Sequence, residues 1–249
     1  MNNKDNSEFI FTLSCPDTSG IVAEVAGFMA KSNLTIKESN QFGDSETNSF
    51  FMRVKALSIN GNDKIDINDI RNNFKLIAKK RKMQFNIYNA NEVPKIIIMV
   101  SKFDHCLVDL LYRVKIGELK AKIVAIISNH SDTETLANSH GIPFHCIKVT
   151  NENKKSAENA LEQLITKYNA EAIILARYMQ ILSKEISDKY SSKIINIHHS
   201  FLPSFKGASP YKQAYKRGVK LIGATAHFVT SDLDEGPIIE QDVARVTHV

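Results

Sequence analysis

The chain has 249 residues, 43% of them hydrophobic and 24% charged, which is enough for a sizeable core in one large or two ordinary domains. The net charge of +5 is spread along the chain and interleaved with acidic residues, so the basic, aromatic-rich groove of a nucleic-acid-binding protein is not expected. No apolar run approaches the roughly 18 residues of a membrane span, and no signal peptide is visible, so we expect a cytoplasmic protein without membrane contact.

Residues 1–89 predict a small domain with the order strand, helix, strand, strand, helix, strand. The first segment, EFIFTLS, alternates apolar and polar residues as a half-buried strand does, and CPDTSG then supplies turn residues. Apolar residues at helical spacing follow. This order is the split β-α-β arrangement of ferredoxin-like domains. The strands are predicted at 8–14, 35–42, 49–56 and 83–88, the helices at 21–31 and 67–82, and a turn at 43–47.

The segment 90–94 is predicted to be a linker, because it is polar, lacks periodicity and ends in Pro94. From residue 95 onward, continuous apolar runs alternate with helical patterns. Such runs are typical of strands that are covered on both faces of a parallel sheet. Residues 95–249 therefore predict a doubly wound, mostly parallel α/β domain, with ligands bound beyond the carboxyl ends of its strands.

The run KIINIHHSFLPSFKGASPY places Asn196 and His198 at the end of an apolar strand. The two alternate on one face of that strand, so an amide and an imidazole can reach the same substrate atom. Asp234, in the later loop TSDLDEG, could orient the histidine, and the three together suit acyl transfer. From the residues alone, a packed histidine and a turn aspartate explain the pattern equally well or better.

The three cysteines are far apart and lack the spacing of a metal site, so no metal is expected. Their odd number favours a reducing compartment. Each is expected to be a small buried hydrophobic residue. The cysteines are Cys15, Cys106 and Cys146.

Three segments, NIHHSFLPSFKGASPY, SDLDEGPIIEQ and LARYMQILS, resemble the signatures of folate-dependent formyltransferases. The resemblance implies a catalytic trio of Asn196, His198 and Asp234. It also implies a folate-binding loop and an opposing wall. These substrate-binding residues are Arg177, Tyr178, Met179, Gln180, Ile181 and Leu182 in the loop, and Thr230, Ser231, Asp232 and Leu233 in the wall.

The segment 101–113, SKFDHCLVDLLYR, lies where a phosphorylated acceptor would need a glycine-rich turn, and it has no glycine. A bound water could then take the place of the acceptor. The segment also resembles the formyltetrahydrofolate deformylase subgroup. That resemblance makes His105 a candidate for ordering water, although a surface or structural role fits as well.

The stretch LSCPDTSGIVAEVAGFMA resembles the start of ACT domains, which bind small amino acids at the turn after the first strand. Asp17 and Gly20 match that turn and are candidate effector-binding residues, or else simply form a tight turn. The resemblance implies control by glycine or methionine, and a homo-oligomer. Deformylases have this domain order.

The resemblance as a whole implies hydrolysis of 10-formyltetrahydrofolate to tetrahydrofolate and formate, in one-carbon and purine metabolism and without a cofactor. The family normally continues for one more helix and strand, so we expect residues 95–249 to lack these elements. That expectation leaves open a non-catalytic amino-acid or folate sensor. The other alternative is formyl transfer to an unidentified amine.

Overall fold

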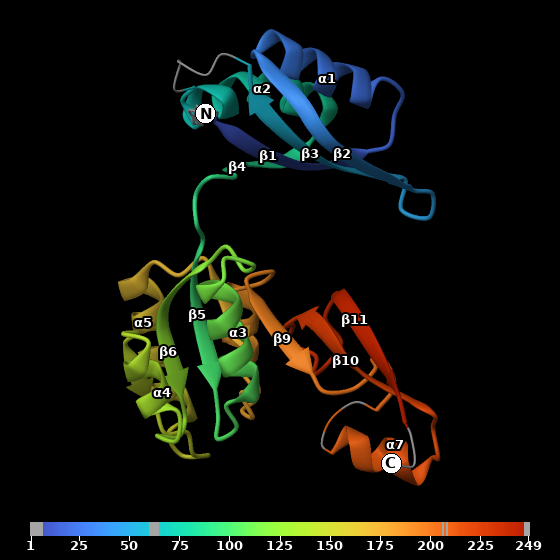
Figure 1. Cartoon of the computed structure of the whole chain (residues 1–249). Helices are drawn as coiled ribbons and strands as arrows, with labels where there is room; N and C mark the ends of the chain where they lie inside the picture. Colours follow the sequence, from blue (N-terminus) through green and yellow to red (C-terminus); the bar gives the residue numbers. More distant parts are fainter. Residues whose placement is uncertain (1–6, 60–64, 206, 208, 247–249) are drawn as a thin grey trace. The chain divides into compact units, whose positions relative to one another are not determined.

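The computed structural model describes residues 7–59, 65–205, 207 and 209–246. The chain divides into two compact units, Met1–Val93 and Pro94–Val249 (Figure 1). The division falls within the segment 90–94 that the sequence predicts to be a linker.

The N-terminal unit has the predicted order of elements, and its strands form one antiparallel sheet in the order β2-β3-β1-β4. The predicted turn at 43–47 begins later, because the pairing of β2 with β3 continues to Asp44 opposite Ser49. The elements are β1 (Glu8–Pro16), α1 (Ile21–Lys31), β2 (Leu34–Asp44), β3 (Ser49–Ser58), α2 (Ile67–Arg81) and β4 (Gln84–Asn89).

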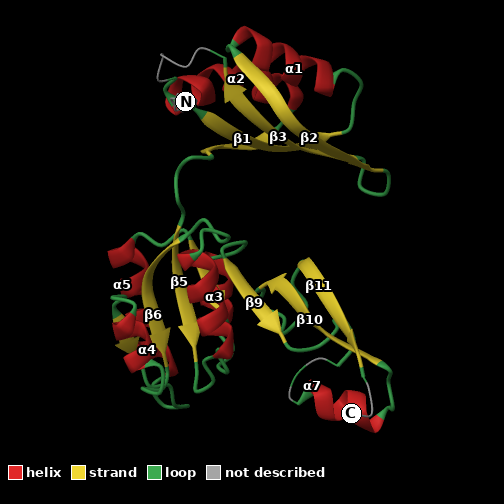
Figure 2. Cartoon of the chain, in the orientation of Figure 1, coloured by secondary structure: helices red, strands yellow, loops and turns green. Residues whose placement is uncertain are grey.

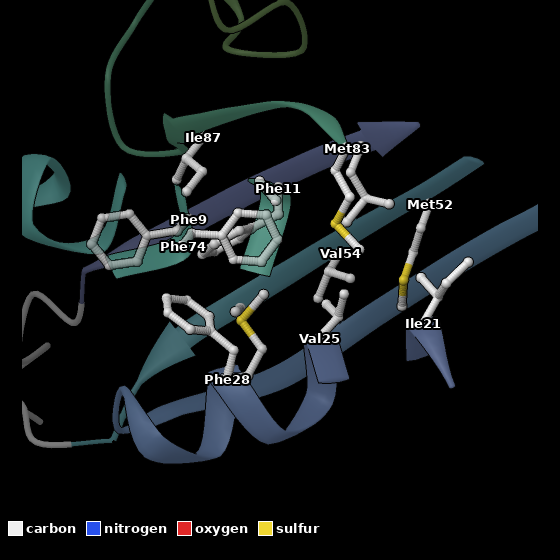
Figure 3. Packing of buried hydrophobic residues seen from close by; sticks show 14 of the residues in the cluster. Phe9, Phe11, Ile21, Val25, Phe28, Met52, Val54, Phe74, Met83 and Ile87 are labelled. Carbon is white, nitrogen blue, oxygen red and sulfur yellow. The ribbon is translucent and has the colours of Figure 1, made fainter. Parts of the chain in front are cut away.

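The core of this unit lies between the helices and one face of the sheet (Figure 3). Along β1, every second side chain is buried, as the sequence alternation predicts. Phe74 of α2 packs edge-on against Phe11 and Phe28, with ring centroids 5.9 and 5.0 Å apart. Burial of one such ring stabilises the fold by about 1.5–3 kcal/mol.

The C-terminal unit is built on a seven-stranded sheet in the order β11-β10-β9-β8-β5-β6-β7 (Figure 2). Strands β5 to β9 are parallel, whereas β10 runs antiparallel to both β9 and β11. The predicted mostly parallel sheet is confirmed. The elements are β5 (Lys95–Val100), α3 (His105–Lys115), β6 (Lys122–Ser128), α4 (Glu134–Ser139), β7 (Phe144–Cys146), α5 (Lys154–Tyr168), β8 (Ala172–Leu175), α6 (Lys184–Lys189), β9 (Ile194–His198), α7 (Pro210–Lys216), β10 (Leu221–Phe228) and β11 (Ile238–Arg245).

Helices cover both faces of the parallel part of the sheet. Along β5, Ile97 and Met99 belong to one buried cluster with α5 and α6. Ile96 and Ile98, which alternate with them, belong to a second cluster with α3 and α4. Burial on both faces is the reason why this strand reads as the unbroken apolar run KIIIMV.

The cysteine prediction is right for Cys15, which is buried, and wrong for Cys146, which is exposed. Cys106 is half-buried. Cys146 ends β7, which is an edge strand of the sheet formed by the described residues. Within the described residues, no helix is both long enough and apolar enough to cross a membrane.

Candidate active site

A cavity of about 270 Å³ opens at the carboxyl ends of β8 and β9, the edge of the sheet where a doubly wound fold is expected to bind ligands. Its wall contains the whole predicted trio and all the predicted substrate-binding residues. The described lining residues are Leu175, Arg177, Tyr178, Met179, Gln180, Ile181, Leu182, Asn196, Ile197, His198, His199, Gly207, His227, Val229, Thr230, Ser231, Asp232, Leu233 and Asp234.

Strand β9 carries Asn196 and His198 two residues apart, so their side chains lie on one face of the sheet. The loop between β10 and β11 supplies Asp234, whose Oδ1 lies 3.3 Å from Nδ1 of His198. His198 is 5% exposed and Asp234 is 8% exposed. A close carboxylate–imidazole pair is thus shielded from water, which strengthens its electrostatic interaction.

His198 has a hydrogen-bond acceptor at each ring nitrogen. The carboxylate of Asp234 faces Nδ1, and the backbone carbonyl of Phe205 lies 3.3 Å from Nε2. A neutral imidazole donates from one nitrogen only, whereas an imidazolium donates from both. Both N–H groups of an imidazolium at this position would therefore have an acceptor.

The loop that carries Asp234 is held tightly. Asp234 has a left-handed φ of 57°, which is uncommon for a residue other than glycine, and its Oδ2 accepts a hydrogen bond from the N–H of Gly207 at 3.1 Å. A Cβ at Gly236 would lie 1.7 Å from the carbonyl oxygen of Phe228. Only glycine permits this close approach, which turns the carboxylate back toward β9.

His227 is a buried residue of the cavity that the sequence analysis did not single out. It lies on β10 directly opposite Asn196 on β9, and such partners share one face of an antiparallel pair. Its Nδ1 donates to the carbonyl of Phe228 at 2.9 Å, which leaves Nε2 to accept from Nδ2 of Asn196 at 3.2 Å. His227 thereby orients the amide of Asn196 and leaves its second N–H available.

Large apolar side chains line the cavity from both sides. Met179 and Ile181 lie on the loop after β8, Leu233 lies on the opposing loop, and all three are more than half exposed. Next to them, burial raises the pKa of Tyr178 to about 12, so that its hydroxyl stays neutral. These walls suit a flat, uncharged ring system better than an ion.

A buried polar chain fixes the loop after β8. The Oγ of Ser101 accepts from the N–H of Met179 at 3.0 Å and donates to Oδ1 of Asn129 at 2.7 Å. Ser101 follows β5 and Asn129 follows β6, and both are buried. The ends of three neighbouring strands are thus joined through hydrogen bonds, which sets the position of this wall of the cavity.

Three predicted residues lie elsewhere. His105 begins α3, is exposed, and is outside the described lining of the cavity. In the N-terminal unit, Asp17 and Gly20 are exposed in the turn between β1 and α1. Gly20 has a left-handed φ of 87°, and a Cβ there would lie 3.1 Å from Nη2 of Arg81. The roles of His105, Asp17 and Gly20 stay predictions.

No group of three or more His, Cys, Asp or Glu side chains is placed to hold a metal ion in the described part of the chain. The residues that converge on the cavity instead supply hydrogen-bond donors, the carboxylates of Asp232 and Asp234, the guanidinium of Arg177 and an apolar wall. This combination suits acyl transfer to or from a neutral ring-bearing substrate.

Comparison with known proteins matches residues 94–249 to the formyl transferase family. A formyltetrahydrofolate deformylase from Corynebacterium sp. (strain P-1) is 46% identical over 239 residues, which are 96% of this chain and 83% of the relative. The crystal structure of a formyltetrahydrofolate deformylase from Pseudomonas syringae superimposes with a TM-score of 0.92 at 42% identity, covering 97% of this chain and 80% of the other. One from Burkholderia mallei gives a TM-score of 0.89 at 48% identity, covering 97% and 85%.

Proposed function

The chain belongs to the formyl transferase family and, within it, to the formyltetrahydrofolate deformylases, and on this premise we propose that it hydrolyses 10-formyltetrahydrofolate to tetrahydrofolate and formate. The observation that carries the mechanism is the buried contact of His198 with Asp234, on the same side of the sheet as Asn196. It supports formyl chemistry that these residues perform themselves, without a cofactor.

In the proposed reaction, water attacks the formyl carbon and the carbonyl π electrons move onto the formyl oxygen. The free N–H of Asn196 and the protonated ring of His198 stabilise that oxyanion. The carboxylate of Asp234 orients the water and supports the positive charge of His198. The bond from carbon to N10 then breaks, the nitrogen gains a proton from the attacking water, and formate leaves with release of the other proton.

The loop between β5 and α3 supports water as the formyl acceptor. Residues 101–104 contain no glycine, and Asp104 at the helix start makes no side-chain capping hydrogen bond. An acceptor phosphate would need closely approaching backbone N–H groups there. His105, the next residue, keeps its proposed role in ordering water from outside the cavity wall.

The N-terminal unit is proposed to be an ACT-type regulatory domain. Its antiparallel sheet, the order β2-β3-β1-β4 and the left-handed Gly20 before α1 support this assignment. Asp17 and Gly20 would bind a small amino acid, glycine or methionine, and the chain would form a homo-oligomer. Through formate and tetrahydrofolate, the cytoplasmic enzyme would balance one-carbon units for purine synthesis.

The test is formate release from 10-formyltetrahydrofolate by the purified chain without any amine, beside an Asp234→Asn variant. We expect formate and tetrahydrofolate in equal amounts from the parent, and turnover reduced by about 10³–10⁴-fold in the variant, by analogy with other carboxylate–histidine pairs. An intact Asp234→Asn variant with normal turnover would exclude the assigned role of the carboxylate.

Two alternative functions predict different outcomes of the same assay. A transferase to an unidentified amine would release product only after an amine is added. A sensor would bind folate, glycine or methionine at equilibrium and release no formate under any condition. The convergence of the trio on one cavity favours an enzyme over a sensor, and the glycine-free loop between β5 and α3 favours water over a phosphorylated acceptor.

A further inference from the structure

Arg177 lies just beyond the carboxyl end of β8, at the edge of the sheet where the cavity opens. It follows β8, which lies between β5 and β9 in the sheet, and it lines the cavity. Its φ is 63°, in the left-handed region that bulky residues rarely adopt. Such strained backbone persists only where the surrounding structure holds it, and it is common at functional sites.

The guanidinium of Arg177 is held without a counter-charge. Its carbon lies 5.5 Å from the centroid of the Phe103 ring, and its Nε is buried without a hydrogen-bond partner. Within residues 7–59, 65–205, 207 and 209–246, no carboxylate forms an ion pair with it. A partly buried cation that lacks its anion is costly, so the arrangement is suited to receiving one.

The positive field of Arg177 reaches the catalytic strand. The pKa of His199, the residue after His198, is lowered first by burial and then by the charges of Arg177 and His198. Asp234, the nearby carboxylate, already accepts from His198 and from the N–H of Gly207. Arg177 therefore adds positive charge to the end of the cavity that holds His198 and His199.

We propose that the Arg177 side chain anchors a subsite for the formate product, a small planar carboxylate. The inference rests on the proposed hydrolysis, in which formate is the anion formed at the reacting carbon, whereas the glutamate carboxylates of the folate are separated from N10 by the benzoyl ring. Paired guanidinium N–H groups match the two oxygens of a carboxylate. Phe103 covers one face of the guanidinium and so favours a small ligand.

The experiment measures binding of ¹³C-labelled formate to the full chain by NMR, with and without tetrahydrofolate, and with chloride as the ionic control. The same proteins are assayed for inhibition of hydrolysis by added formate and by added tetrahydrofolate. The variants are Arg177→Gln, Arg177→Lys and Phe103→Ala. Arg113→Gln is the matched control, because Arg113 is an arginine of α3 paired with Asp109 and Glu118 outside the cavity lining.

We expect saturable formate binding by the parent and the Arg113→Gln control, and an affinity about 10- to 100-fold lower in Arg177→Gln, as for the loss of a charge-assisted hydrogen bond. Arg177→Lys should recover part of the loss, since it keeps the charge without the fork. Inhibition by formate should weaken in parallel, and by a larger factor than inhibition by tetrahydrofolate, which the loop after β8 also contacts.

Equal formate binding by the parent and Arg177→Gln, or no saturable binding by the parent with or without tetrahydrofolate, would overturn the subsite. If Arg177→Gln does not fold, Phe103→Ala decides, because the Phe103 side chain is 60% exposed and its loss should weaken formate binding without unfolding the chain. Failure of the proposed function would be distinct, since it would appear as absence of turnover by the parent whatever the binding result.

Discussion

The two units bury very different side chains. Among the described residues of the N-terminal unit, the buried set is apolar apart from Ser58, and aromatic rings lie at its centre. The C-terminal unit buries many polar groups, mostly at the carboxyl ends of its strands. These are Ser101, Ser128, Asn129, Thr133, Ser187, His198, Ser200, Thr225, His227 and Asp234.

This difference indicates that the buried side chains of the N-terminal unit serve stability, whereas those of the C-terminal unit also serve the reaction. Buried polar groups lower the stability of the folded state unless they are hydrogen-bonded, so many of them in one region indicate a function there. In the C-terminal unit, His198, His227 and Asp234 line the cavity, and the hydrogen-bonded pair Ser101 and Asn129 holds the loop that forms one of its walls. The apolar unit should therefore respond to core substitutions through stability, and the polar unit through activity.

The largest effect is expected from Phe74→Ala in the apolar core. Phe74 is fully buried and packs on the rings of Phe11, Phe28 and Phe85, so its removal should lower the free energy of unfolding by about 3–5 kcal/mol. Urea unfolding measures this loss. The exposed Phe42→Ala is the control and should change little. A loss below about 1 kcal/mol would mean that the core repacks around the cavity.

The next largest effect is expected from Asn196→Ala, which should lower turnover, whereas Phe74→Ala should lower the free energy of unfolding. If the amide donates to the oxyanion, turnover should fall about 10²–10³-fold, which corresponds to about 2.7–4 kcal/mol of barrier. Steady-state formate release measures the loss, and the free energy of unfolding should fall by no more than about 1–3 kcal/mol, the cost expected when buried His227 loses its partner. The exposed Asn72→Ala serves as control. Near-normal turnover by a folded Asn196→Ala chain would show that the amide does not stabilise the oxyanion.

Ser101→Ala should lower both the stability of the fold and the activity, each by an intermediate amount. The N–H of Met179 and the amide of Asn129 would lose a buried partner, at a cost of about 1–3 kcal/mol. Because the loop after β8 moves and the trio does not, the KM for the folate should rise more than kcat falls. Exposed Ser139→Ala is the control. A fall in kcat alone would show that Ser101 does not act through the loop.

The smallest effect is expected at a partly exposed ion pair of the N-terminal unit. Hydrogen bonds from Arg81 and then Lys80 lower the pKa of Glu24 from 4.5 to about 2. A depressed carboxylate pKa stabilises the fold above the unfolded value, and that contribution is lost as the pH falls from about 4.5 toward 2. Water and salt screen the pair.

Glu24→Gln should therefore be less stable than the parent near neutral pH, and the gap should close on acidification through that window. Thermal unfolding across the pH range measures it, with exposed Glu46→Gln as control. A gap that stays constant down to pH 2 would show that the ion pair is not its cause.

Much of the fold could be predicted because burial leaves a period in the sequence. The alternating β1 and the unbroken β5 were both read correctly, since one is covered on one face and the other on both. The strand β7 was missed because three residues, FHC, are too short to show a period. Strand β10 begins at Leu221, and its first half is hard to recognise in the sequence because Gly223 and two alanines weaken the apolar signal of a strand.

The cavity was predicted less completely for a different reason. Asn196 and His198 are neighbours on one strand, so the sequence alone placed them on one face. His227 meets Asn196 only through the antiparallel pairing of β10 with β9, and a single sequence does not state which strands pair. The polar His227 inside the run LIGATAHF was the one available signal, since a buried polar side chain in a strand needs a partner.

The ring of His198 has consequences for chemical labelling. Both of its nitrogens face acceptors, and only 5% of the side chain is exposed. An alkylating or acylating reagent needs a free nitrogen lone pair, and hydrogen bonds to Asp234 and Phe205 would occupy both nitrogens. Exposed His105 would be modified first. The rate at which such a reagent inactivates the enzyme would then report how often the contacts of His198 with Asp234 and Phe205 break, rather than how reactive the imidazole is.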